Sequence, residues 1–70
     1  MKINSAEDFG SAIKRKRKML GYTQVYLSDV TGLSTTFISD VEKGKVTCEL
    51  GKCIRLANLL ALDVNVTSRS

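Results

Sequence analysis

Histidine and proline are absent from this chain of 70 residues, and cysteine occurs only twice. Without histidine, two thiols cannot supply the four ligands of a tetrahedral zinc site. Cys48 and Cys53 lie five positions apart on or beside one expected helix, a spacing that does not suit a disulfide. We therefore expect reduced thiols that pack as small apolar groups, as in a reducing cytosol.

Long apolar runs are also missing, because no segment approaches the roughly 20 consecutive apolar residues that span a bilayer. The first residues include Glu7 and Asp8 and lack the apolar centre of a signal peptide. No proline-rich tract, low-complexity stretch or internal repeat marks a linker. The sequence thus predicts one soluble, cytoplasmic domain over residues 1–70. A domain this small buries little surface, so we expect a second subunit to support it.

Acidic residues are the minority charge, with 7 of them against 11 basic residues and a net charge of +4. A basic excess in a small domain favours a polyanionic partner, nucleic acid before an acidic membrane. Five basic residues run from Lys14 to Lys18. On a helix, successive residues turn by about 100°, so this run faces all sides and is not one contact surface. Arg17 falls on the inner side, with Ile13.

Apolar periodicity and capping residues predict helices over about residues 6–20, 24–31, 35–43 and 50–61. Ser5, Thr23 and Ser34 stand at helix starts, and glycines follow the first three helices. The expected inward side chains, helix by helix, are Phe9, Ile13 and Leu20; Val25, Leu27 and Val30; Phe37, Ile38 and Val41; and Leu50, Cys53, Ile54, Ala57 and Leu60.

The last apolar residues alternate with polar ones, which predicts a short β-strand over about residues 62–67. A lone strand has no partner in a four-helix chain, so we expect it to pair with the same segment of a second subunit. Leu56 and Leu59 widen the apolar side of the last helix, and we place them in this dimer interface. A disordered tail is the alternative.

The two short central helices are separated only by Gly32, Leu33 and Ser34. Short helices joined by a glycine-containing turn form the helix-turn-helix unit. Gly32 allows the tight reversal, Leu33 fills the angle between the helices, and Ser34 caps the second helix. The N-terminus of that second helix stays open, as it must be to enter the major groove of DNA.

The wider pattern resembles the Cro/C1-type (XRE) helix-turn-helix family over about residues 9–62. The resemblance is carried by Arg17, Leu20-Gly21, Thr23-Gln24, Leu27, Gly32-Leu33-Ser34, Ile38-Ser39, Glu42 and Gly44. Residues 37–45, Thr47, Gly51-Lys52 and 63–66 are similar to antitoxin-type regulators related to HipB. The resemblance implies an all-α, lambda-repressor-like four-helix domain that binds an operator as a dimer, often with a toxin kinase encoded alongside.

The resemblance also implies roles for individual residues. Gln24 would donate to a phosphate from the N-terminus of its helix, where the helix dipole favours an anion as well. Thr35, Thr36 and Asp40 would read bases from the outer face of the recognition helix, with a solvated polar face as the alternative. Asp40 would accept a hydrogen bond from cytosine, or reject other bases and non-specific phosphate.

Five further residues complete the expected DNA-binding set. Ser39 fits base contact and a solvated face equally well. Thr23 and Ser34 are helix caps first, whose hydroxyls could also touch phosphate, whereas Lys43 and Lys45 are best placed for phosphates. In the family, the arginine that matches Arg17 pairs with the glutamate that matches Glu42, and we expect that structural role here rather than a DNA contact.

Two functions remain open at this point. The first is a DNA-binding transcriptional regulator, a repressor that binds a palindromic operator as a homodimer. The alternative is an antitoxin-type interaction subunit of a HipA-like toxin kinase complex that also regulates its own operon; co-purification of a second chain distinguishes the two. We expect no enzyme, cofactor or metal site, because histidine, a paired-carboxylate cleft and a glycine-rich phosphate loop are all missing.

Overall fold

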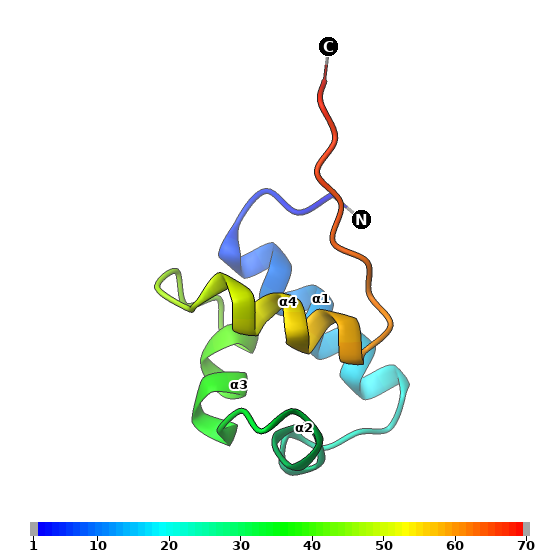
Figure 1. The fold of residues 1–70 in the computed structure, drawn as a ribbon, viewed down its shortest axis with the longest axis vertical. Helices are drawn as coiled ribbons and strands as arrows, with labels where there is room; N and C mark the ends of the chain where they lie inside the picture. Colours follow the sequence, from blue (N-terminus) through cyan, green and yellow to red (C-terminus); the bar gives the residue numbers. More distant parts are fainter. Residues whose placement is uncertain (1, 70) are drawn as a thin grey trace.

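Residues 2–69 are described by a computed structural model (Figure 1). Its helices are α1 (Ala6–Met19), α2 (Gln24–Thr31), α3 (Thr35–Glu42) and α4 (Leu50–Leu59). The prediction of an all-α, four-helix domain is confirmed. Helix α2 has the expected bounds, and the other three end one or two residues earlier than expected, where hydrogen bonds of the last turn tighten.

Hydroxyl side chains begin the first three helices. Ser5 accepts from the Asp8 N–H, Thr23 from the Tyr26 N–H and Ser34 from the Phe37 N–H, each over 3.0 Å. Each bond satisfies one of the N–H groups that a helix start leaves unpaired. Helix α4 has no such cap, since the side chain of Glu49 makes no capping bond.

The core lies between all four helices, with α3 packed against α1 and α2, and α2 packed against α4. Its buried apolar residues are Ile13, Leu27, Leu33, Ile38, Val41, Cys53, Leu56, Ala57 and Leu60. Leu33 fills the angle of the turn as expected, and Gly32 before it adopts a φ of 76°. Cys53 and the half-buried Cys48 are unbridged and pack with the core, as the sequence predicts.

Two predicted core positions on α2 are wrong. Val25 and Val30 are exposed, the first by 62%, and Leu27 and Thr31 form the inward side instead. Thr31 can be buried because its hydroxyl donates to the Leu27 carbonyl over 2.6 Å and accepts from the Leu33 N–H. An internally satisfied threonine therefore replaces an apolar residue on the buried face.

The apolar side of α4 is also rotated from the expected one. Leu50 is 71% exposed, whereas Leu56, predicted for a dimer interface, is completely buried. Cys53, Leu56, Ala57 and Leu60 follow the spacing of one helical face, and Leu50 lies outside it. Leu20 is likewise partly exposed, because α1 ends before it.

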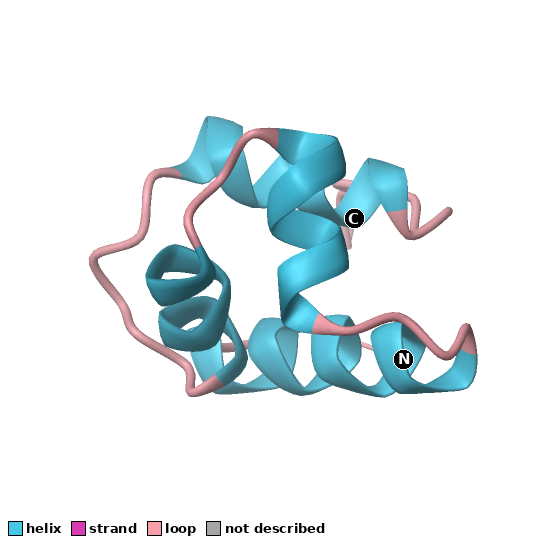
Figure 2. Ribbon diagram, turned by 90° about the horizontal axis from the view of Figure 1, so that it is seen from below, coloured by secondary structure: helices cyan, strands magenta, loops and turns pink. Residues whose placement is uncertain are grey.

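The expected strand over residues 62–67 is absent from the described chain, which contains helices and loops alone (Figure 2). After Leu62 the chain leads away from the helices (Figure 1), and Val66 is fully exposed. A strand exists only through hydrogen bonds to a neighbour, and no second strand lies within residues 2–69. The prediction of a strand is therefore wrong for the single chain.

Helices α1 and α3 approach each other closely at Gly10, a residue that the sequence analysis does not single out. A Cβ atom built on Gly10 would collide with the backbone oxygen of Val41 and lie 3.1 Å from that of Glu42. Only glycine permits this approach, which sets the end of α3 against α1.

Candidate nucleic-acid interface

The helix-turn-helix unit consists of α2, the turn of residues 32–34 and α3. Its two helices lie across each other below α1 and α4 (Figure 1). The side chain of Ser34 binds the N–H of Phe37, so the first turn of α3 is capped while its end remains at the surface. Thr35 and Thr36, which follow directly, are both exposed. The unit thus presents the N-terminus of α3 to solvent, as a recognition helix requires.

The outer side of α3 carries a row of polar side chains. At about 100° per residue, Thr36, Asp40 and Lys43 fall on one side, opposite the buried Ile38 and Val41. Lys43 is exposed, and Asp40 is partly exposed. Ser39 lies beside this row and is half-buried.

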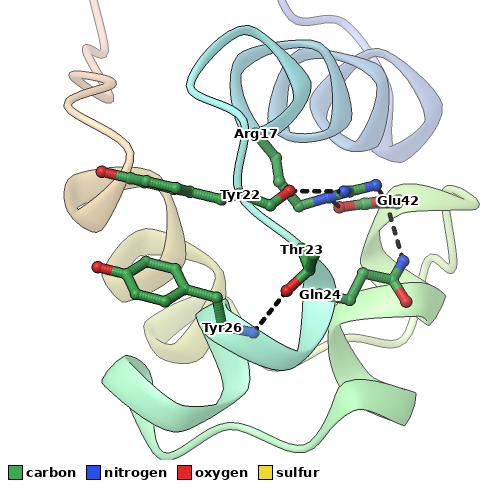
Figure 3. A network of polar contacts seen from close by, with 6 residues as sticks. All are labelled: Arg17, Tyr22, Thr23, Gln24, Tyr26 and Glu42. Atoms are coloured by element: carbon green, nitrogen blue, oxygen red, sulfur yellow. Dashed lines mark hydrogen bonds and ion pairs between the residues drawn. The ribbon is translucent and has the colours of Figure 1, made fainter.

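A buried polar network ties α1, α2 and α3 together (Figure 3). The guanidinium of Arg17 donates from Nε to Glu42 Oε2 over 2.6 Å and from Nη2 to Oε1 over 2.9 Å. Nη1 donates to the Tyr22 carbonyl over 3.0 Å. These side chains are only 11% and 4% exposed. The predicted pairing of Arg17 with Glu42 is confirmed.

The network also changes the pKa of Arg17. The hydrogen bonds that Arg17 donates to Glu42 raise the pKa of Arg17 above its ordinary value, against the lowering effect of burial. Among the described residues, every buried side-chain nitrogen or oxygen has a hydrogen-bond partner. Arg17, the fourth residue of the basic run on α1, is therefore buried and not available to DNA.

Gln24 has a structural contact that sequence reasoning missed. Its Nε2 donates to Glu42 Oε1 over 3.1 Å, which holds the amide at the start of α2 (Figure 3). A primary amide has two N–H donors, so one remains for another acceptor. The contact with Glu42 fixes where that second donor can reach.

Two tyrosines beside the network were also missed. The rings of Tyr22 and Tyr26 lie 4.6 Å apart between centroids, at 42° to each other. Figure 3 shows both rings pointing away from Glu42. The two tyrosines flank Thr23 in the sequence, and the side chain of Thr23 caps the start of α2. The only sequence signal was the spacing of four residues between two aromatic side chains.

Arg55 holds the other end of α2, a second contact that no sequence signal indicated. Its Nη1 donates to the Thr31 carbonyl over 2.9 Å. A cation is favourable there, because the last carbonyls of a helix carry partial negative charge and lack partners within the helix. The helix-turn-helix unit is thereby fastened to α4 as well as to α1.

Across residues 2–69, no group of three or more potential metal-binding side chains of histidine, cysteine, aspartate or glutamate comes together. None of the helices described is long and apolar enough to span a membrane.

The fold and this site define a class, the small helix-turn-helix DNA-binding domains. A family model described as Helix-turn-helix matches residues 13–66, well over half of the chain. The chain belongs to this family, in its Cro/C1-type (XRE) form, which comprises DNA-binding regulators rather than enzymes.

Two sequence relatives support this membership. The chain is 29% identical over 65 residues to the uncharacterized HTH-type transcriptional regulator y4mF of Sinorhizobium fredii, covering 93% of this chain and 86% of that protein. It is 37% identical over 57 residues to the ImmF control region 10 kDa protein of Bacillus phage phi105, covering 81% and 63% respectively.

Solved structures show the same fold. A complex of a HipB variant with an O2 20mer aligns with a TM-score of 0.89 at 24% identity, over 100% of this chain and 97% of that one. A HipB–O4 20mer complex aligns at 0.88 and 24% identity, over 100% and 99%. The HipB-like architecture implied by the sequence is thus confirmed.

Proposed function

We propose that this chain is a repressor that binds a palindromic operator as a homodimer. The observation that carries the proposal is the presentation of α3, whose start is open and whose outer row is polar. The contacts of Arg17, Gln24 and Glu42 brace that helix against α1 and α2. A helix that is already held in place loses little conformational entropy when it enters a groove.

The length of α3 supports the proposal of a dimer. Its eight residues extend roughly 12 Å and reach one stretch of major groove. Two such helices related by two-fold symmetry would read two half-sites about 34 Å apart. The C-terminal segment supports a dimer, because the apolar side chains of Val64 and Val66 are exposed.

We assign the DNA contacts as follows. Thr35, Thr36 and Asp40 read bases, and Ser39 lies at the edge of that surface. Lys43, Lys45 and the second amide donor of Gln24 contact phosphates. The hydroxyls of Thr23 and Ser34 accept capping bonds and still have a proton to donate to a phosphate.

Selection of bound sequences from random duplex DNA tests the proposal. We expect enrichment of a two-fold-symmetric sequence, and a stoichiometry of two chains per site in titrations of that duplex. A single half-site that binds one chain equally tightly would contradict the dimer. Selection without enrichment would contradict sequence-specific binding.

The antitoxin alternative has no observation of its own in favour of it. The likeness to HipB, at 24% identity, concerns the fold. Purification of the chain from its native cells under mild conditions distinguishes the two functions. A stoichiometric second protein would point to the interaction subunit, and the chain alone with its DNA would support the repressor.

A further inference from the structure

Asp40 and Lys45 form an ion pair at the C-terminal end of the recognition helix. Lys45 Nζ lies 3.4 Å from Asp40 Oδ2, with the two side chains 55% and 33% exposed. Asp40 belongs to the outer row of α3, and Lys45 follows the helix by three residues. One of the expected base-reading groups therefore already has a cation bound to it.

Backbone hydrogen bonds place Asp40 and Lys45 next to each other. The Lys45 N–H donates to the Asp40 carbonyl and the Gly44 N–H to the Val41 carbonyl, each over 3.0 Å. These are the two bonds of a Schellman motif, completed by a φ of 84° at Gly44. The two residues thus stand beside each other whatever their side chains do.

Lys43 provides the contrast. It projects from the same side of α3 and makes no ion pair or hydrogen bond with its side chain within residues 2–69. Its charge is available to any phosphate, whereas Lys45 is paired with Asp40.

Near DNA, the contact of Lys45 with Asp40 competes with a contact between Lys45 and a phosphate. An exposed ion pair is weak and can exchange partners. If Lys45 turned to a phosphate on an arbitrary sequence, it would leave a bare carboxylate in the strong negative field of DNA, which is unfavourable. A base that donates an amino hydrogen to Asp40, such as cytosine, compensates the carboxylate.

We propose that Asp40 and Lys45 act as a conditional phosphate contact. On the correct base, Asp40 exchanges Lys45 for the base amino group and Lys45 is released to a phosphate. On other sequences the pair stays closed and Lys45 contributes nothing. Asp40 thereby couples base reading to backbone contact and suppresses non-specific binding. This inference rests on the proposed sequence-specific DNA binding.

The test is the salt dependence of binding to the selected operator and to a scrambled duplex of equal length. Each phosphate contact contributes about 0.9 to the slope of the logarithm of affinity against that of salt concentration. We expect Lys45→Met to lower the slope by about 0.9 on the operator only. In an Asp40→Asn background, the same substitution should lower the slope on both duplexes.

Two comparisons calibrate the measurement. Lys43→Met should lower the slope on both duplexes in either background. Glu49 and Lys52 form another exposed ion pair, 2.8 Å apart at the start of α4, and serve as the matched control. Glu49→Gln and Lys52→Met should leave the difference between the two duplexes unchanged. Asp40→Asn should lower the ratio of operator to scrambled affinity roughly tenfold.

Distinct outcomes separate this inference from the proposed function. If operator preference is present and Lys45→Met lowers both wild-type slopes equally, the exchange is refuted and the repressor stands. If Lys45→Met changes neither slope, the exchange is likewise refuted. If the wild-type chain binds both duplexes with equal affinity, both proposals fall together. Circular dichroism confirms that each variant is folded, which these exposed positions favour.

Discussion

Arg17 and Glu42 are charged side chains that the fold removes almost entirely from water. Taking charges out of water is costly, and the cost is offset here by two parallel hydrogen bonds between them and by the bonds to Tyr22 and Gln24. The pair joins α1 to α3, so the orientation of the recognition helix depends on it. Stability and the proposed reading of DNA therefore depend on the same contact.

Removal of one partner should be strongly destabilising, because the other charge stays buried. We expect Arg17→Met or Glu42→Met alone to cost about 3–5 kcal/mol in the free energy of unfolding. The double variant should cost clearly less than the sum of the two. Urea unfolding of the four proteins measures the coupling. Small additive losses would instead mean that the pair is weak and solvated.

Cys53 makes a prediction about alkaline pH. Burial, followed by the neighbouring Cys48 thiol, raises the pKa of Cys53 above its ordinary value. The folded protein then holds this proton at a pH where the unfolded chain releases it, so the contribution to stability is full below the unfolded pKa and is lost as pH rises through the higher folded pKa. Unfolding free energies at pH 7 to 10.5 should fall less steeply in Cys53→Ala than in the wild type. Parallel profiles would show that the thiol does not contribute.

At the scale of whole elements, the packing of α1 depends on its close approach to α3. Gly10 lies inside α1, where alanine would ordinarily stabilise the helix by about 1 kcal/mol. The contact with the backbone of Val41 and Glu42 reverses that expectation, because a backbone cannot move aside as a flexible side chain can. We expect Gly10→Ala to lower the melting temperature by more than about 10 °C.

Gly51 supplies the matched control. It also lies inside a helix, and a Cβ added there would meet nothing within 4 Å. Gly51→Ala should therefore raise stability by up to about 1 kcal/mol. Equal effects of the two substitutions in thermal unfolding would mean that the approach of α1 to α3 is looser than the structure has it.

The C-terminal segment matters at the scale of the whole molecule. Residues 63–69 run beyond the helices without secondary structure, with Val66 fully exposed (Figure 1). If they hold two subunits together, deletion from Asp63 onward should leave a folded monomer that binds the operator far more weakly. Analytical ultracentrifugation and circular dichroism measure these properties separately. A truncated chain that remains an equally tight dimer would assign the interface to the helices.

The starts of the first three helices and the turn between α2 and α3 are determined by the sequence alone. The caps at Ser5, Thr23 and Ser34 and the turn at Gly32 involve bonds between residues at most four apart, so local residue types suffice to predict them. The family pattern supplied one long-range contact, between Arg17 and Glu42. The outward row of α3 followed from helical periodicity.

The tertiary structure decided which side of each short helix is buried. Val25 and Leu50 satisfy the apolar pattern and are exposed, because a helix buries only the side that its neighbours reach. The approach at Gly10, the contact of Arg55 with the end of α2 and the pairing of Asp40 with Lys45 also lie beyond the sequence pattern. Periodicity indicates that a helix has an apolar side, whereas packing against specific neighbours determines its rotation and which polar groups meet.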